Sequence, residues 1–477
     1  MNMKICSSEV ECSGLSLVDE FGKLLFWNNK VLRAIKHEFV GNAKDMLSNG
    51  MLSELVENNL FPRTWITDFA IDGYGLVLEH ERIVPILYPY EWSFSMIKDA
   101  AISVLKVNQI AIKYGYQTKD CHPFNILFDD LTPKYVDLGS FVKINKNMSG
   151  WMAYKQFLES FYFPLKIWSK GNSFIARSMI ANASEHLPLS EYMLYKSSLA
   201  KRLNYSVIKR ISDLYLNYKY LSMYSSKEIM ELRPDIIGSV ISRLREHKLL
   251  PFVSVNFSGL IKKVENINKK EGPSTWGKYH HEFHDDDGEI RSTPRFDRII
   301  EIVDAYHIGT AVELGGNQGV LSKLLKMKTK IERMICIDYD ENAIDTLYLS
   351  AKDQKVTITP ALLNCIFPIT FINCKDPWER TRSDVVIALA LAHHLLLGRG
   401  LGIDFILETI AKYSHKYVLI EFMPLGLWDG EKAPLIPQWY NIEWFRNSFT
   451  QRFNLISEEQ LEENRILFFG ELIAKND

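Results

Sequence analysis

The 477-residue sequence has few cysteines and no long hydrophobic run, and neither sign of charge predominates. Its six cysteines include no CxxC pair, which indicates reduced thiols in a cytosolic protein rather than a disulfide framework. The strongest apolar run, residues 385–392, is too short to cross a membrane and predicts a buried strand. With 56 Lys and Arg against 58 Asp and Glu, there is no bulk attraction for nucleic acid or anionic membranes.

The first residues, "MNMKICSSEVECSG", place no apolar segment behind Lys4. This is not the pattern of a secretory signal. We therefore expect a soluble, cytoplasmic protein that has no membrane span and no nucleic-acid partner. The sequence does not predict an oligomeric state.

The length favours two domains, and a polar, Gly- and Pro-containing stretch at 262–294 marks their boundary. We expect a first domain over 1–255, a linker or lid over 256–294 and a second domain over 295–477. His280, His281, Glu282, His284 and Asp285–Asp287 follow one another too closely for a standard ligand spacing. They predict a solvated loop and no metal site.

Two aromatic residues of this boundary segment suggest a second role for it. Trp276 and Tyr279 directly precede the second domain. They are candidates for a lid over a bound cofactor.

The second domain alternates apolar strands with amphipathic helices, beginning with "TAVELG" and "RMICID" and ending with "YVLIEF". This alternation predicts an α/β fold with a parallel sheet covered on both faces. Two further strands, "FNLISEEQ" and "RILFFGEL", are joined by a short acidic link. They predict an antiparallel pair that closes the sheet.

A glycine-containing loop, "VELGGNQG", follows the first of these strands, where open α/β sheets bind ligands. Gly315 permits a tight turn, Gly319 permits close approach of the following helix, and the Glu313 carboxylate can accept from an ammonium group. Asp338 ends the second strand, where an acid can bind both hydroxyls of a ribose.

Together these features resemble the class I S-adenosylmethionine-dependent methyltransferases, which have a seven-stranded Rossmann-like sheet with this ending. The resemblance implies S-adenosylmethionine as cofactor, with its methionine portion near Glu313, Gly315, Asn317 and Gly319. Asp338 would bind the ribose and Leu362–Asn364 would lie near the adenine. Asn317 stands where the family usually has Gly, but Asn tolerates positive φ, so the loop can still form.

His393 and His394, at the end of the fourth strand, would face the transferred methyl group and are candidates for the catalytic base. Other interpretations remain open: the glycines could belong to a cofactor-free module, Asp338 could cap a helix, and either histidine could be a packed residue. Glu421 could line an acceptor pocket or be a solvated acid at a strand end.

The first domain contains "KDCHPFNILFDDLTPKYVDLGS", with Asp120, Asn125 and Asp137 around a predicted hairpin. This spacing resembles the catalytic loop and metal-binding turn of the protein-kinase-like and aminoglycoside-phosphotransferase-like fold. The resemblance implies that Asp120 orients an acceptor hydroxyl, while Asn125 and Asp137 hold magnesium on ATP.

The upstream half of the kinase-like pattern is weaker. No Gly-rich phosphate loop is recognisable, Lys30 and Arg33 are both candidates for the phosphate-binding cation, and Glu54 and Glu57 for its helix partner. An accessory domain without phosphotransfer is therefore favoured, with active phosphotransfer and an unrelated fold as alternatives.

In order, "KDCHPFNILF", "VDLGSF", "STWGKY", "ALAHHLLL" and "LIEFMPLG" resemble a bacterial group of two-part methyltransferases that includes nodulation host-specificity proteins. This resemblance implies methylation of an oxygen on a glycan or another small-molecule or secondary-metabolite acceptor. The alternatives are a bifunctional kinase and methyltransferase acting on a glycan end, and a non-catalytic binding protein built from two degenerate enzyme folds.

Overall fold

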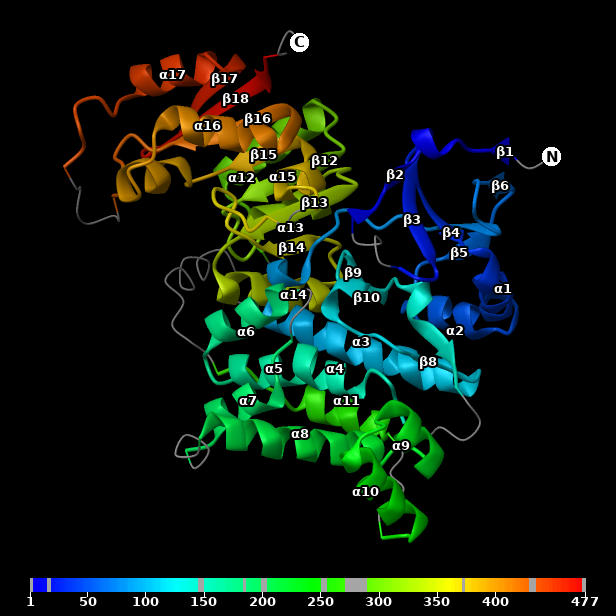
Figure 1. The fold of residues 1–477 in the computed structure, drawn as a ribbon. Helices are drawn as coiled ribbons and strands as arrows, with labels where there is room; N and C mark the ends of the chain where they lie inside the picture. Colours follow the sequence, from blue (N-terminus) through cyan, green and yellow to red (C-terminus); the bar gives the residue numbers. More distant parts are fainter. Residues whose placement is uncertain are drawn as a thin grey trace.

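The computed structural model of the protein describes residues 3–14, 19–144, 150–182, 186–198, 204–249, 255–270, 290–370, 374–428 and 435–473. It has two parts (Figure 1). The amino-terminal part combines a small sheet with a helical layer, and the carboxy-terminal part is built on a larger sheet.

The amino-terminal sheet has five described strands, which pair antiparallel in the order β2-β3-β4-β7-β5. These strands are β2 (Glu11–Cys12), β3 (Gly22–Trp27), β4 (Lys30–Ile35), β5 (Thr64–Ile66) and β7 (Leu76–His80). Between β4 and β5 the chain forms α1 (Val40–Ser48) and α2 (Met51–Glu57). A separate parallel pair joins β1 (Met3–Lys4) to β6 (Phe69–Ala70).

The central helix of the amino-terminal part is α3 (Phe94–Lys113). Its apolar positions recur at helical spacing, and Ile97, Ala101 and Val104 are fully buried. Gly115, at φ +76°, follows the end of the helix in the left-handed conformation that glycine adopts readily. The further helices of this part are α4 (Tyr154–Phe157), α5 (Phe163–Trp168), α6 (Ser173–Ala181), α7 (Leu189–Lys196), α8 (Tyr205–Leu221), α9 (Ser226–Leu232) and α10 (Ile236–Glu246).

After α3 the chain forms two small strand pairs. Strand β8 (Tyr116–Thr118) pairs with β11 (Phe141–Lys143), and β9 (Ile126–Asp129) pairs with β10 (Thr132–Tyr135). The second pair is the predicted hairpin, and Asp130 in its turn has φ +50°. The hairpin places the residues before β9 and after β10 side by side.

The carboxy-terminal sheet has seven strands, as the sequence predicted, and their order is β14-β13-β12-β15-β16-β18-β17. The first five pair in parallel and β18 runs antiparallel to both of its neighbours. The strands are β12 (Thr310–Leu314), β13 (Arg333–Asp338), β14 (Thr359–Leu362), β15 (Ser383–Ala388), β16 (Ser414–Phe422), β17 (Phe453–Glu462) and β18 (Arg465–Leu472). The helices of this part are α12 (Pro294–Ala305), α13 (Val320–Lys328), α14 (Glu341–Gln354), α15 (Pro377–Thr381), α16 (Ile403–Lys412) and α17 (Ile442–Thr450).

The two parts meet where α14 lies over α3 (Figure 1). Tyr348 Oη donates to Asp99 Oδ2 at 2.6 Å, and the backbone N–H of Ser95 donates to Asp345 Oδ1 at 2.7 Å. A second contact pairs Arg380, at α15, with the fully buried Glu91 through two hydrogen bonds. Charged groups therefore join the two parts in buried surroundings.

The predicted linker is partly helical. Residues Phe257–Glu265 form α11, which packs on α3, and the Phe257 ring lies 5.1 Å from that of Trp151. This segment therefore packs as an element of the amino-terminal part. None of the helices in the described residues combines the length and the apolar character that crossing a membrane requires.

Candidate functional site

The loop between β12 and α13 has the backbone that its sequence predicts. Gly315, Asn317 and Gly319 have φ values of +71°, +50° and +66°. Asn317 therefore adopts the left-handed conformation in place of the glycine usual in the family, and its Oδ1 accepts from the N–H of Gln318 at 2.9 Å. A Cβ atom on Gly319 would lie 2.7 Å from Leu347 Cδ1, so this glycine lets the loop pack against α14.

Asp338 connects the end of β13 to this loop. Its Oδ2 accepts from the N–H of Asn317 at 2.8 Å, and its Oδ1 accepts from the N–H of Asp340 at 2.8 Å. The carboxyl is 8% exposed, and burial raises its pKa. The helix α14 is capped by Asp340 instead, so the capping function that was an alternative for Asp338 falls to its neighbour.

Glu313 lies beneath the loop. Its Oε2 accepts from the Ser322 hydroxyl, and a Cβ on Gly316 would lie 2.9 Å from Glu313 Cδ. Burial raises the pKa of Glu313 to about 7, while Ser322 and Arg295 oppose the shift. The described contacts of Glu313 thus support the loop and the start of α13.

The two candidate bases follow β15. His393 is 5% exposed and its Nδ1 has no hydrogen-bond partner among the described residues. Burial, His394 and Arg465 lower the pKa of His393 to about 3, and burial also lowers the pKa of His394. The rings lie 4.1 Å apart, and His394 is the more exposed of the two. Both imidazoles are neutral at pH 7, the form in which a histidine can accept a proton.

A buried charged cluster lies at the adjacent strand end. Glu421, fully buried at the end of β16, accepts from Arg465 Nη1 at 3.0 Å and lies 3.6 Å from Arg295 Nε. Its Oε2 also accepts from the N–H of Ala390, a non-glycine residue at φ +47°. This bond holds the β15 loop in a sparsely populated conformation, as is common at functional sites.

The sequence reasoning left Glu421 undecided and missed both arginines. Arg465 begins β18 and Arg295 lies in the first turn of α12, so only the tertiary fold brings them together. No local spacing indicates such a cluster.

Asn364 lies just after β14. This strand neighbours β13 in the sheet, and Asp338 is the last residue of β13. Its Oδ1 accepts from the N–H groups of Ile366 and Phe367, each at 3.0 Å, so the carbonyl fixes the turn after β14. The proposed lid residues Trp276 and Tyr279, and the segment from His280 to Asp287, lie outside the described residues.

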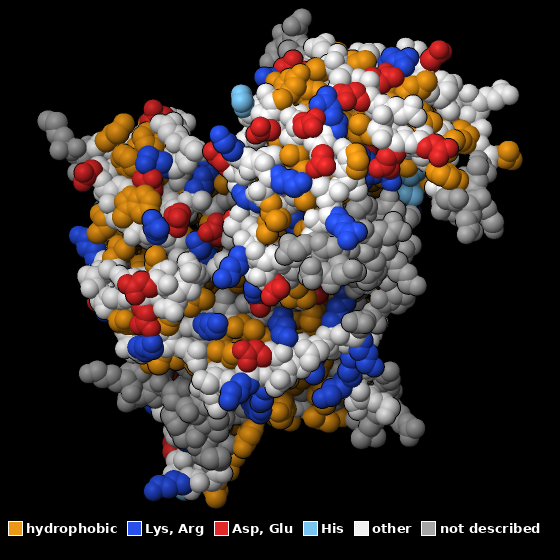
Figure 2. All heavy atoms as spheres, turned by 180° about the vertical axis from the view of Figure 1, so that it is seen from behind, with side chains coloured by type: hydrophobic (Ala, Val, Ile, Leu, Met, Phe, Trp, Pro, Cys, Tyr) orange, Lys and Arg blue, Asp and Glu red, His pale blue; other side chains and the backbone are white. Residues whose placement is uncertain are grey.

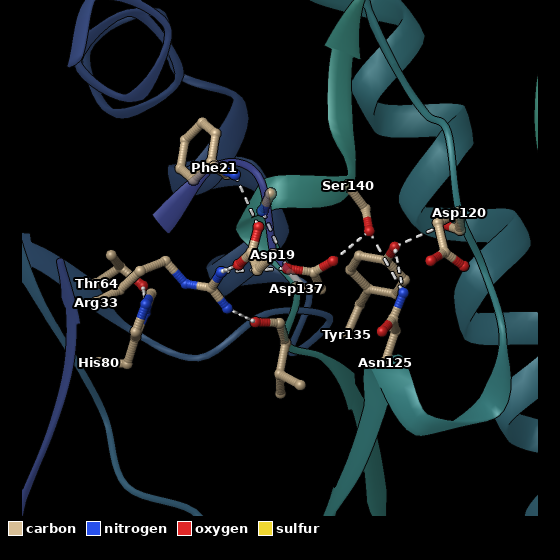
Figure 3. Close-up of polar contacts among 12 residues, drawn as sticks. Asp19, Phe21, Arg33, Thr64, His80, Asp120, Asn125, Tyr135, Asp137 and Ser140 are labelled. Atoms are coloured by element: carbon tan, nitrogen blue, oxygen red, sulfur yellow. Dashed lines mark hydrogen bonds and ion pairs between the residues drawn. The ribbon is translucent and has the colours of Figure 1, made fainter. Parts of the chain in front are cut away.

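In the amino-terminal part, the structure brings Asp120, Asn125 and Asp137 to one cavity (Figure 3). Ser140 donates its hydroxyl to Asp137 Oδ2 and lies 3.3 Å from Asn125 Nδ2. Tyr135 donates to the carbonyl of Asp120 at 2.7 Å. The three residues that the sequence spacing singled out therefore lie close together in the structure.

Arg33 occupies the position opposite Asp137 (Figure 3). Its Nη1 lies 2.9 Å from Asp19 Oδ2 and 3.3 Å from Asp137 Oδ1. Lys30, the other candidate cation, is bound by both oxygens of Glu79 at 2.7 and 2.8 Å. A guanidinium therefore faces the carboxylate that would hold magnesium in the kinase-like pattern, and repulsion disfavours a second cation there.

Glu54, one of the two candidate helix partners for this cation, is engaged elsewhere. Glu54 accepts from the Lys113 ammonium group and from Tyr114 Oη, the latter at 2.8 Å. Asp19 and Asp137 act as the carboxylate partners of Arg33 instead. Within the described residues, no group of three or more His, Cys, Asp or Glu side chains is arranged to hold a metal ion.

The order of the seven strands, with a reversed seventh strand and a turn of positive φ values after β12, gives the carboxy-terminal part the fold of the class I S-adenosylmethionine-dependent methyltransferases. A carboxylate at the end of β13 bonds directly to that turn. Both features lie at the carboxyl ends of adjacent parallel strands, where such sheets bind ligands.

No family model matches the chain. The chain is 23% identical over 367 residues to nodulation protein NoeA of Rhizobium meliloti (strain 1021), covering 73% of this chain and 71% of that protein. Among solved structures, an S-adenosylmethionine-dependent methyltransferase from Clostridium acetobutylicum is 10% identical with a TM-score of 0.32, covering 42% of this chain and all of the other. N-methyltransferase NodS from Bradyrhizobium japonicum WM9 is 12% identical with a TM-score of 0.29, covering 38% of this chain and 98% of the other.

Proposed function

We propose that the protein transfers a methyl group from S-adenosylmethionine to an oxygen of a glycan or other small-molecule acceptor. The hydrogen bond between the Asn317 N–H and Asp338 Oδ2 carries this proposal, because it joins the loop of β12 to the acid of β13. A cofactor over these two strand ends would meet backbone N–H groups and a carboxylate suited to ribose hydroxyls. The similarity to a nodulation protein agrees with the group of two-part methyltransferases that the sequence resembles.

The bound cofactor supplies an electrophilic methyl group. The protein's task is to hold the acceptor in line with that group and to remove the hydroxyl proton as the new bond forms. His394, neutral and more exposed than His393, is the proposed base. The Glu421 cluster holds the adjacent β15 loop through Ala390.

Calorimetric titration of the full chain with S-adenosylhomocysteine tests cofactor binding. We expect micromolar affinity that falls at least tenfold in Asp338→Ala, because the ribose loses its carboxylate partner. Asp353→Ala removes an exposed acid from α14 and serves as the matched control. Unchanged affinity in Asp338→Ala would contradict the proposed site, and absence of binding in the native protein would favour a non-catalytic binding protein.

We also propose that the amino-terminal part is a kinase-like accessory domain. Support comes from the five-stranded antiparallel sheet with α1 and α2 inserted after its central strand, and from the polar cluster around the hairpin. The ion pair between Arg33 and Asp137 argues against phosphotransfer. Magnesium-dependent ATP binding that disappears in Asp137→Ala would instead favour the bifunctional kinase and methyltransferase.

A further inference from the structure

The three helices α8, α9 and α10, at residues 205–249, expose much apolar surface, which we call the α8–α10 surface. Of the 30 large hydrophobic side chains that are exposed in the described residues, 12 belong to this stretch, although it is only about a tenth of the described chain. Ile236 and Leu249 are 82% and 71% exposed. Exposed apolar side chains that gather in this way mark a surface for a partner or a membrane.

Helix α8 has two different apolar faces. Ile208 and Leu216 recur at helical spacing and are buried, so they face the rest of the molecule. A second set follows spacings of three and four residues and is 44–50% exposed, namely Val207, Ile211, Leu214, Tyr215 and Tyr218. Residues at these spacings share one side of a helix, so α8 carries an apolar stripe that is open to solvent.

Helix α10 repeats this arrangement. Ile236, Val240 and Leu244 follow one another at four-residue spacing and are 82%, 52% and 37% exposed, while Gly238 and Ile241 are buried where α10 packs on α9. The helix lies at one end of the molecule (Figure 1). Seen from behind, hydrophobic and basic side chains lie next to one another along the same lower edge (Figure 2).

The charges of the α8–α10 surface are predominantly basic. Residues 205–249 contain eight Lys and Arg against five Asp and Glu, whereas the two kinds balance over the whole chain. Three of the acids are engaged within these helices, namely Glu231 with Lys227, Asp235 with Arg233, and Glu228 with the backbone N–H of Ser225. By helical position, the other two acids, Asp213 and Glu246, lie away from the apolar stripes.

Basic side chains, in contrast, lie beside both stripes. Arg210 is four residues before Leu214 on α8, and Lys219 Nζ lies 5.4 Å from the centre of the Tyr215 ring. On α10, Arg243 follows Val240 by three residues. Residues at these spacings are neighbours on a helix surface. The surface therefore combines apolar stripes with a basic border, and the exposed tyrosines join the two.

This combination selects one kind of partner. A second copy of the chain that paired its α8–α10 surface with this one would bring basic borders together. A nucleic acid would match the charge but leave the apolar stripes unused. An anionic bilayer suits both, because apolar side chains enter the headgroup boundary, tyrosines lie at that level, and Lys and Arg meet the lipid phosphates. We infer that the α8–α10 surface binds the surface of a bilayer that contains anionic lipids.

Cosedimentation of the full chain with vesicles tests this inference. The vesicles consist of phosphatidylcholine alone or of phosphatidylcholine with phosphatidylglycerol. We expect the protein to sediment with the anionic vesicles and not with the neutral ones. Its partition coefficient should fall as sodium chloride is added, because salt screens the attraction between the basic border and the lipids.

The basic border is tested by Arg210→Gln combined with Arg243→Gln. We expect the partition coefficient on anionic vesicles to fall roughly tenfold or more, because two charges beside the stripes are lost. Lys44→Gln combined with Lys330→Gln removes two exposed charges elsewhere and is the matched control. The control should bind like the native protein.

The apolar stripe is tested by Ile236→Ser. We expect the partition coefficient to fall roughly tenfold, because the side chain no longer enters the boundary. Phe174→Ser is the matched control, since Phe174 is 83% exposed but belongs to α6. Circular dichroism of each variant establishes that it is folded.

Four results would overturn the inference. They are no binding to anionic vesicles, equal binding to neutral ones, binding that survives both the border and the stripe variants, and binding to poly-glutamate without binding to vesicles, which would indicate an acidic protein partner. A dimer in sedimentation velocity that Ile236→Ser dissociates would likewise assign this surface to a second copy. The surface contains none of the proposed cofactor-binding residues, so vesicle binding and S-adenosylhomocysteine binding can fail separately.

Discussion

Glu313 is a residue whose ionisation works against folding at neutral pH. Burial raises its pKa to about 7 from the ordinary 4.5, so the folded protein holds this proton more tightly than the unfolded chain does. Its stabilising contribution is complete below pH 4.5 and is lost as the pH rises through about 7. The Ser322 hydroxyl donates to Oε2 and compensates part of the cost of the buried charge.

Glu313→Gln should therefore stabilise the cofactor-free protein at pH 8 by up to about 3 kcal/mol relative to the native protein, and much less at pH 4.5. The glutamine carbonyl still accepts from Ser322. Urea denaturation at the two pH values measures the difference, and the exposed Glu332→Gln is the control. A stability difference that does not change with pH would mean that Glu313 is not buried as described.

At this scale the sequence predicted backbone roles better than side-chain partners. Asn317 was expected to tolerate positive φ, and it does so at +50°. The partners of Glu421, in contrast, come from residues 126 positions before and 44 positions after it, Arg295 and Arg465. Local spacing carries no information about such contacts, because the sheet order creates them.

At the scale of elements, the turn between β12 and α13 depends on close packing against α14. Gly319 has φ +66°, and a Cβ there would lie 2.7 Å from Leu347 Cδ1 and 3.0 Å from Cδ2. A side chain at this position would have to displace Leu347 and adopt a left-handed conformation.

Gly319→Ala should lower the free energy of unfolding by roughly 1–3 kcal/mol and weaken S-adenosylhomocysteine binding. Gly41→Ala in α1 is the matched control, because its Cβ would meet nothing within 4 Å, and we expect it to be neutral or stabilising by about 0.5–1 kcal/mol. Denaturation and calorimetry of both variants measure these effects. If Gly319→Ala behaved like Gly41→Ala, the turn would not be packed as described.

Elements were the most predictable level of this protein. The alternation of apolar strands and amphipathic helices predicted the parallel strands of the larger sheet, because buried parallel strands are apolar throughout. The two runs joined by a short acidic link predicted its antiparallel pair. The boundary segment was less predictable. The polar stretch at 262–294 indicated a linker over 256–294, but Phe257, Leu260 and Val264, at the start of this linker, form a buried face of α11. Three apolar residues are a weak signal for a helix.

At the scale of the whole molecule, the two parts are joined by a buried ion pair. Arg380 donates to both oxygens of Glu91, and their side chains are 3% and 0% exposed. The two residues are 289 positions apart, so the sequence could not indicate this contact.

Arg380→Met leaves the Glu91 carboxylate buried without its partner and should lower the free energy of unfolding by about 3–5 kcal/mol. Adding Glu91→Leu removes the stranded charge and should restore much of the loss. Lys352→Ala disrupts a more exposed pair with Asp99 and should cost no more than about 1 kcal/mol. If urea denaturation showed that Arg380→Met and Lys352→Ala lower the free energy of unfolding equally, the pair of Arg380 and Glu91 would be accessible to water and not buried as described.

The most direct test of the methyltransferase assignment is a crystal structure of the full chain soaked with S-adenosylhomocysteine. We expect the ligand over the carboxyl ends of β12 and β13, with its ribose hydroxyls on Asp338 and its amino-acid end along the loop of residues 315–319. A ligand bound in the amino-terminal cavity instead, or a loop left empty in the soaked crystal, would contradict the assignment.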